Sequence, residues 1–312
     1  MNERSELFRP FLHDQSRQLT TSLTSYPPQQ IAALDAAYTA AVSRKRLRFF
    51  AGLGVFVMLL ILAGLGAEVA PKTFIDKIGN FAGYFDRILN LDTGQRVWTD
   101  PAEWFWGWQK WLKLLAETLL LSYVGTTIGT LGAFGLNFFA AANLSPHPAL
   151  RFVVRRLLEF CRTVPSIVFA LIFVIAFGLG PMAGVLAIGI HSIGALGKLY
   201  SEQAENIDMK PLEGVRSTGA SWLSSIRFAV LPQVMPGFAS YTLLRFEINV
   251  REASVMGFVG AGGIGQELVV AVRKFFYSDV SAILLMIIIT VFVIDICTGW
   301  LRGRLFGAEQ RA

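Results

Sequence analysis

The 312-residue chain is 54% hydrophobic and only 16% charged, with a mean hydropathy of +0.51. It is too apolar for an ordinary soluble domain and too long for one membrane span, so we expect an all-α protein that crosses a lipid bilayer several times. The net charge of +6 does not indicate nucleic acid, because Lys and Arg cluster beside apolar runs, as the positive-inside rule explains. Cys161 and Cys297 lie in different segments, so we expect neither a structural disulfide nor a metal site.

Residues 1–48 predict a cytoplasmic tail that contains an amphipathic helix and ends in a basic run. We expect no signal peptide, because no short apolar stretch ends in a small-residue cleavage site. Residues 49–67 form a 19-residue run without charge. At about 1.5 Å per residue this run is long enough to cross a hydrocarbon core of about 30 Å, so it predicts the first transmembrane helix. The apolar positions at helical spacing in the tail are Ile31, Leu34, Tyr38 and Val42.

Residues 68–117 return to mixed charge and carry five of the seven tryptophans. Tryptophan concentrates at membrane–water interfaces, so we expect a periplasmic segment with a helix along the outer leaflet. The alternative is a platform on which sugars or bases stack. The five residues are Trp98, Trp104, Trp106, Trp108 and Trp111.

Residues 118–301 predict a membrane core with five further spans, which makes six in all. We expect spans at 118–143, at 233–250 and at 280–301, and two more within 163–197 that turn at residues 178–181. The Arg-rich loop at 143–163 and the Arg-flanked tail at 302–312 place both termini in the cytoplasm, with 251–279 outside.

A polar stretch at residues 200–232 interrupts this apolar pattern. Pro211 suits the first turn of a short helix, Gly219 a left-handed bend, and Ser221 the cap of a second helix. A helix, a bend and a helix with mixed charged and apolar groups predict a docking surface for another protein. An ordinary loop between spans is the alternative.

The same stretch carries a motif: Glu213-Gly214-Val215, three residues, Gly219, nine residues, then Ala229-Val230-Leu231-Pro232. It resembles the EAA motif of permease subunits in binding-protein-dependent ABC importers, although Gly214 and Val215 fill two small positions and Ala229 replaces a usual isoleucine. Residues 162–166, 217–221, 245–251 and 257–265 extend the likeness, so that residues 118–301 resemble the phosphonate-importer permease family.

The resemblance implies a type I importer permease core in a bacterial inner membrane, with phosphonate as cargo, or phosphate, phosphite or another small oxyanion. It implies two cytoplasmic ATPase subunits, a periplasmic substrate-binding protein and a second permease copy that makes a homodimer. ATP and Mg²⁺ would bind in the ATPase partner, so this chain would hold no cofactor and would not be an enzyme. The ATPase-coupling residues would be Glu213, Gly214, Val215, Arg216, Gly219, Leu231 and Pro232.

Charged residues inside predicted spans are costly near lipid, so Arg245, Glu247 and Arg251 are expected to face the interior of the bundle or its outer interface. Glu247 and Arg251 are four residues apart and can pair on one helix face. The functional alternative is that Arg245 or Arg251 offers positive charge to an anionic cargo, because guanidinium groups match phosphoryl oxygens.

The segment after these charges fits the pattern G-x-G-x-x-G of dinucleotide-binding sites. That pattern needs a βαβ unit in a parallel sheet, for which the neighbouring spans leave no room. We therefore expect irregular backbone that lines a path or gate. The glycines concerned are Gly260, Gly262, Gly263 and Gly265.

Two rival functions remain. An ion-coupled secondary transporter would use Glu247 and Asp295 as coupling groups, but the sequence has no clear inverted repeat. A membrane enzyme would need an assembled nucleophile or metal set, which the sequence does not offer. His191, within the fourth predicted span, is interpreted as a packed residue, with a role in the path as the alternative.

Overall fold

The computed structural model describes residues 28–67 and 71–309, and within these ranges every regular element is a helix. The chain divides into two compact units, residues 1–80 and 81–312. The predicted all-α class is confirmed, because the described residues form no strand beyond an isolated bridge between Asn90 and Arg96.

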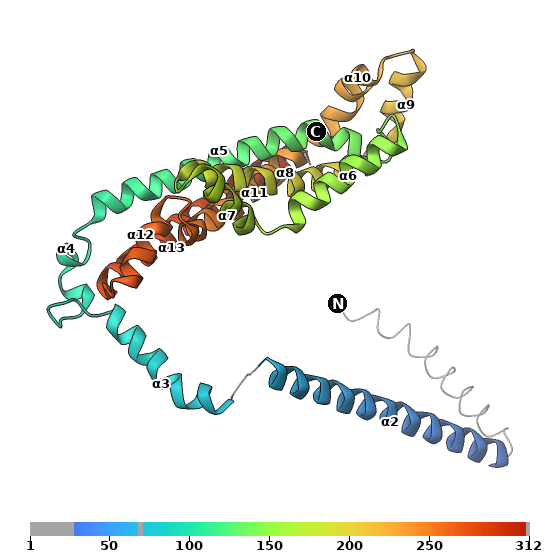
Figure 1. Ribbon diagram of the computed structural model, residues 1–312. Helices are drawn as coiled ribbons and strands as arrows, with labels where there is room; N and C mark the ends of the chain where they lie inside the picture. Colours follow the sequence, from blue (N-terminus) through green and yellow to red (C-terminus); the bar gives the residue numbers. More distant parts are fainter. Residues whose placement is uncertain (1–27, 68–70, 310–312) are drawn as a thin grey trace, which may run out of the picture. The chain divides into compact units, whose positions relative to one another are not determined.

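The first unit contains α2 (Pro28–Gly66), drawn in blue in Figure 1, and the start of α3 (Pro71–Ile88). No proline interrupts residues 29–70, so the helix that begins in the predicted tail continues through the first predicted span without a break. The boundary expected at residue 48 falls inside α2. Residues 1–27, which hold the rest of the predicted tail, lie outside the described residues.

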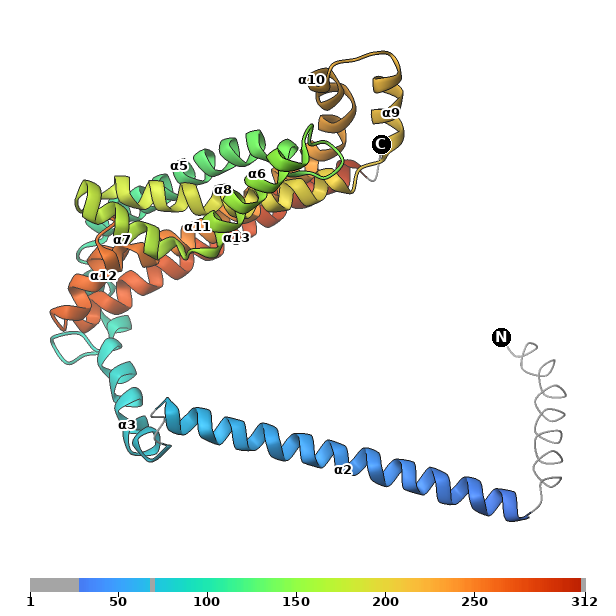
Figure 2. The same ribbon diagram turned by 45° about the vertical axis from the view of Figure 1, so that its right-hand side comes forward.

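The second unit is a helical bundle in which α5 (Trp108–Ala140) and α8 (Pro181–Glu205) run side by side (Figure 2). Glycines on α5 allow this approach: a Cβ added to Gly129 would lie 2.3 Å from the Cβ of Ser192. Small residues at such contacts replace the hydrophobic drive that lipid cannot supply. The other helices of this core are α6 (Pro148–Thr163), α7 (Ser166–Phe177), α11 (Leu231–Met256), α12 (Ile264–Arg273) and α13 (Tyr277–Glu309).

Four described helices are long and apolar enough to cross a membrane: those within α2, α5, α8 and α13. Two bent pairs raise the number to six if each pair is one span: α6 with α7, bent by 87°, and the stretch Trp222–Val259 with α12, bent by 45°. The structure therefore agrees with about six spans, and the turn expected at residues 178–181 separates α7 from α8.

Two segments expected to be loops are helical. Residues 148–163, expected to be an Arg-rich loop, form α6, which is amphipathic and begins at Pro148, a residue suited to the first turn of a helix. Pro165 then ends it, because a proline disfavours helical backbone in the residue before it. Likewise, the outer loop expected at 251–279 contains the end of α11 and the whole of α12.

The Trp-rich segment contains α4 (Pro101–Trp104) and the first turns of α5. Trp104 Nε1 donates to Ser281 Oγ at 2.9 Å, and Trp106 Nε1 donates to Asp279 Oδ1 at 2.8 Å, so both tie this segment to α13. Trp111 is fully buried, whereas Trp98, Trp106 and Trp108 expose most of their surface. The structure thus gives part of the tryptophan set a packing role that the sequence does not predict.

Candidate coupling surface and translocation path

A compact projection lies between α8 and α11 at one end of the core; we call it the coupling knob, residues 208–230 (Figure 1). It consists of α9 (Met209–Ser217), α10 (Trp222–Ser225) and a π-helical turn (Ile226–Val230). Asp208 caps α9 and Ser221 caps α10. Between the helices Gly219 has φ +79°, the left-handed region that glycine enters without steric cost. The predicted helix, bend and helix are confirmed.

The base of the coupling knob is fixed to the core. Leu212 of α9 and Val230 of the π-helical turn are fully buried in one apolar cluster with residues of α5, α8 and α11. The Gln233 side chain adds a polar brace: it accepts from Asp208 N at 3.0 Å and donates to Ala229 O at 2.6 Å. These contacts join the start of α9 to the first turn of α11.

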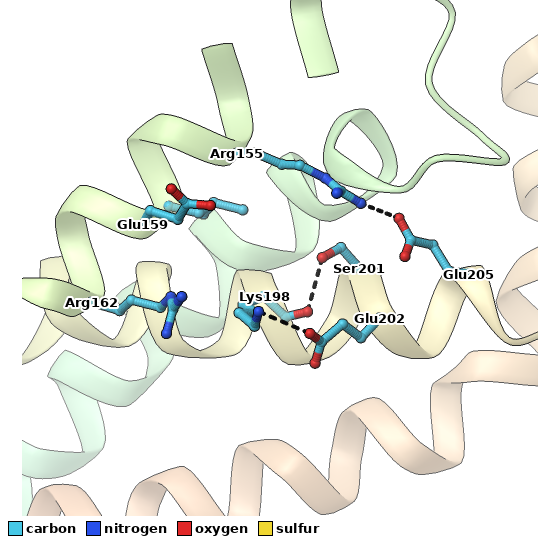
Figure 3. A pocket seen from close by; sticks show the side chains of 8 residues that line it. Arg155, Glu159, Arg162, Lys198, Ser201, Glu202 and Glu205 are labelled. Atoms are coloured by element: carbon cyan, nitrogen blue, oxygen red, sulfur yellow. Dashed lines mark hydrogen bonds and ion pairs between the residues drawn. The ribbon is translucent and has the colours of Figure 1, made fainter. Parts of the chain in front are cut away.

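The turn between α5 and α6 is held from two sides. Trp222 Nε1 donates to Leu144 O at 2.7 Å, and its ring stacks on Phe139. On the other side Glu205, at the end of α8, accepts from Ala142 N at 2.7 Å and pairs with Arg155 of α6 (Figure 3). No local sequence pattern predicts these links, because each joins residues at least 50 positions apart.

We expect Trp222→Phe to weaken the coupling between ATP hydrolysis and transport while the subunit stays folded. The phenyl ring keeps the stack on Phe139, but Leu144 O loses its donor, at a cost of about 1 kcal/mol. ATP hydrolysis stimulated by the substrate-binding protein should fall by about fivefold. Trp108→Phe is the matched control, because Trp108 is exposed and its indole donates no hydrogen bond within the described residues. Equal activity in the two variants would contradict the transmission role of Trp222.

The predicted coupling residues divide into two groups by exposure. Val215 and Leu231 pack against the apolar cluster at the base of the coupling knob. The others are exposed: Glu213, Gly214, Arg216, Gly219 and Pro232. Glu213 makes no hydrogen bond or ion pair with any described residue, so its carboxylate is available to a partner. Two exposed apolar side chains, Leu223 and Phe228, add to this surface.

A second group of predicted residues lies on α11, near the middle of the bundle. There Asn249 Nδ2 donates to Thr126 Oγ1 of α5 at 2.8 Å and to Ser192 Oγ of α8 at 2.9 Å. Arg245 Nε also donates to Ser192 Oγ, at 3.2 Å. All four residues are buried, and Arg245 exposes only 8% of its surface. We call Arg245, Asn249, Ser192 and Thr126 the polar network; its buried hydrogen bonds join α5, α8 and α11.

The charges of α11 form separate pairs. Arg245 Nη2 reaches both oxygens of Glu252, at 3.3 and 3.4 Å. Glu247 is buried and pairs with Arg251, as the spacing of four predicts. Glu247 also accepts from Thr298 at 3.5 Å and lies 3.6 Å from Arg302 Nη2, which ties α11 to α13.

One face of the bundle exposes charged side chains of α11 and α13. Arg251 and Glu252 line a cavity with Ser166 of α7, and Arg251 also lines a second cavity with Asp295 of α13. Arg251 exposes half of its side chain and Glu252 about a quarter. Charged groups at this depth are too costly to face lipid. This face therefore lines water or meets another subunit.

The glycine-rich segment forms the break between α11 and α12. Gly260, Gly262 and Gly263 have positive φ, and Ile264 N donates to Thr118 Oγ1 of α5 at 2.9 Å. Gly260 O accepts from Gly180 N, at the turn before α8. A Cβ at Gly265 would lie 1.9 Å from Ser254 O, so the backbones touch there.

The break supplies the irregular backbone that the sequence predicts, and its helical neighbours exclude the βαβ unit of a dinucleotide site. The described contacts join it to α5 and to the turn before α8 rather than to Arg245. His191 Nδ1 lies 3.1 Å from Val164 O and so ties α8 to the bend between α6 and α7.

Residues 125–306 match the family described as binding-protein-dependent transport system inner membrane component. The chain is 43% identical over 198 residues to the phosphite transport system permease protein PtxC of Stutzerimonas stutzeri, covering 64% of this chain and 72% of that protein. It is 38% identical over 234 residues to the phosphate-import permease protein PhnE of Mycolicibacterium smegmatis, covering 74% of this chain but 41% of that protein. It is 50% identical over 118 residues to PhnE2 of Escherichia coli K12, whose name assigns it to a cryptic phosphonate transport system; the match covers 38% of this chain and 97% of that protein.

Solved structures share the fold. The MetNI methionine ABC transporter in an inward-facing conformation matches with a TM-score of 0.54 and 18% identity, over 62% of this chain and 95% of that chain. A bacterial ABC transporter that imports alginate matches with a TM-score of 0.55 and 14% identity, over 77% of this chain and 95% of that chain. The chain therefore belongs to the binding-protein-dependent transport system inner membrane component family: it is a multi-pass membrane permease of an ABC importer, not an enzyme, and works with ATPase and substrate-binding partners.

Proposed function

We propose that this permease carries phosphonates into the cell, with phosphate, phosphite or another small oxyanion as the alternative cargo. The observation that carries the proposal is the Arg245 guanidinium, buried halfway along the bundle and held by Ser192. A guanidinium presents a planar set of donors that fits phosphoryl oxygens. The names of three relatives, which specify phosphite, phosphate and phosphonate transport, support the same class of cargo.

The assembly proposed has two copies of this chain, two ATPase subunits and one periplasmic binding protein. The charged face that includes Arg251 and Glu252 would lie toward the second copy and a water-filled path between the two. Both termini would be cytoplasmic. The Arg-rich α6 and the coupling knob lie at the same end of the core, which the positive-inside rule assigns to the cytoplasm.

In this mechanism ATP binds only to the ATPase subunits, and their closure moves the two coupling knobs. The Gln233 brace and the buried base of the coupling knob pass that movement to α11, while the links from Trp222 and Glu205 pass it to α5, α6 and α8. The helices that carry the polar network then move as a body, which exposes the path alternately to each side of the membrane. The glycine-rich break, with Gly260, Gly262, Gly263 and Gly265, would form part of the gate at the opposite end.

The test is ATP hydrolysis by the complex reconstituted in proteoliposomes with its own binding protein. The panel is methylphosphonate, aminoethylphosphonate, phosphite, phosphate and sulfate. We expect the phosphonates to stimulate hydrolysis and uptake most, and sulfate least. If phosphite or phosphate stimulates best, the alternative cargo is correct. A complex that responds to none of the phosphorus oxyanions contradicts the proposal.

A further inference from the structure

The nitrogen–oxygen distances between Arg245 and Glu252 are long for a buried ion pair. One nitrogen, Nη2, serves both carboxylate oxygens at 3.3 and 3.4 Å, whereas charge-assisted bonds normally measure about 2.7–2.9 Å. Arg245 itself is rigidly placed, because Ser192 Oγ accepts from its Nε and Asn249 holds Ser192. Its Nη1 has no acceptor within hydrogen-bond distance among the described residues. The guanidinium is thus fixed, while its carboxylate partner is held weakly.

The carboxylate of Glu252 has space to turn away from Arg245. This carboxylate makes no hydrogen bond within the described residues except to Arg245. Glu252 also lines a cavity of about 270 Å³ with Ser166, Arg251 and the apolar side chains of Ile167, Val255 and Met256. Water occupies about 30 Å³ per molecule in the liquid, so the cavity has room for several waters or a small anion. Arg251 lies on the same cavity; it pairs with Glu247 but exposes half of its side chain, so it offers Glu252 a second cation to share.

We propose that Glu252 is an exchangeable internal counter-ion that competes with the anionic cargo for Arg245 and so sets how tightly the permease holds that cargo. In the empty path Glu252 neutralises the guanidinium. When a phosphoryl oxyanion arrives, its oxygens take the donors of Arg245, and Glu252 turns into the cavity toward Arg251. When Glu252 returns, it displaces the cargo toward the far side. This inference rests on the proposed oxyanion cargo, and it adds a specificity-determining residue that neither the motif nor the sequence pattern singles out.

The competition also explains the charge arrangement. A fixed cation without a competitor would retain a phosphoryl oxyanion, and retention opposes transport, because conduction requires a site weak enough to release its ion. A carboxylate seven residues along the same helix lies about 10 Å away along the axis. Two long side chains bridge that distance only when both extend, which leaves the pair easy to open.

The test compares Glu252→Gln with Glu159→Gln in the complete reconstituted complex. Glu159 is the matched control, because it pairs with Arg156 on the exposed side of α6 and contacts no member of the polar network. Two quantities are measured: equilibrium binding of radiolabelled phosphite and methylphosphonate to the complex in nanodiscs without the binding protein, and uptake in proteoliposomes with it. With its competitor removed, Arg245 should bind the anion about tenfold more tightly, and turnover should slow because release is impaired.

Each outcome decides a different point. Tighter binding in Glu252→Gln that disappears in Arg245→Gln/Glu252→Gln supports the competition. Unchanged binding and unchanged uptake KM in Glu252→Gln overturn it, even if phosphonate transport is intact. Glu252→Asp, with a carboxylate one methylene shorter, gives a second reading if the Gln variant does not assemble: its binding should also tighten, and wild-type values would overturn the inference. A wild-type complex that transports no phosphorus oxyanion instead refutes the proposed function.

Discussion

Arg245→Gln should abolish oxyanion uptake while the complex still assembles and hydrolyses ATP at its basal rate. The guanidinium is the buried positive charge of the polar network, and without it the cargo meets the Glu252 carboxylate with only the half-exposed Arg251, already paired with Glu247, on the same cavity. Two unit charges about 4 Å apart interact by about 4 kcal/mol at an effective dielectric constant of about 20. Uptake in proteoliposomes should therefore fall by about 100-fold or more.

The control for Arg245→Gln must separate a role in transport from a role in folding. Removal of one partner of a buried pair leaves the other charge uncompensated, which is itself destabilising. Arg245→Gln/Glu252→Gln removes both charges and keeps side chains of similar size. If the pair is only structural, the double variant should recover transport. If Arg245 serves the cargo, the double variant should assemble well and still fail to transport.

Arg245→Lys refines this test. It retains the positive charge but loses the planar set of donors, including the Nε that donates to Ser192. We expect assembly as in the wild type and an intermediate uptake rate with a raised KM. Co-purification of the ATPase subunit and the elution volume of the complex report assembly. Loss of the folded complex in all three variants would assign Arg245 to structure.

Local signals in the sequence were sufficient for the spans and for the coupling knob. Charge-free runs located the apolar helices, and Gly219 with Ser221 located a bend and a cap that depend on only a few neighbouring residues. The Glu247–Arg251 pair was predictable for the same reason, because residues four apart share a helix face. Each of these features depends on residues that are near one another in the sequence.

The polar network was not predictable in this way. Asn249 bonds to Thr126 and Ser192, which are 123 and 57 positions away, and no local pattern ties these residues together. The pairing of Glu252 with Arg245 was not predictable either, because the two residues lie two turns apart, beyond the spacing normally used to assign ion pairs. A weak signal was present: Ser122 and Thr126 lie four apart on α5, a helix that is otherwise mostly apolar. Polar residues at such positions indicate contacts between helices.

The secondary structure of α6 was not predicted for a different reason. Its arginines indicate the side of the membrane, whereas its secondary structure depends on the apolar residues between them. Three of these apolar residues are buried in the folded unit: Val154, Leu158 and Cys161. The helix contains no proline after its first turn, so nothing in the sequence opposed a helix. Charge distribution predicts the side of the membrane, but it does not predict secondary structure.

Gly219→Asp should leave the permease folded in the membrane and uncouple it from the ATPase. A side chain at this position meets no heavy atom within 4 Å in the subunit, and the backbone has φ +79°. Asp is among the few residues that tolerate this region. The subunit itself therefore accommodates the substitution. The added carboxylate projects from the bend between α9 and α10, where a partner groove would close around the coupling knob, so cargo-stimulated ATP hydrolysis should fall by about tenfold or more.

Two further substitutions determine which property of Gly219 matters. Gly219→Asn has the size of Asp and a similar tolerance of the left-handed region, but no charge. Gly219→Ala adds one methyl group and costs about 1 kcal/mol of backbone strain. If Asp and Asn both lose stimulation and Ala retains most of it, the groove has no space for a longer side chain. If only Asp loses it, repulsion by an acidic groove is responsible. If Gly219→Asp keeps normal cargo-stimulated hydrolysis, the bend is not in the ATPase contact, and Glu213 and Arg216 on α9 become the residues to test.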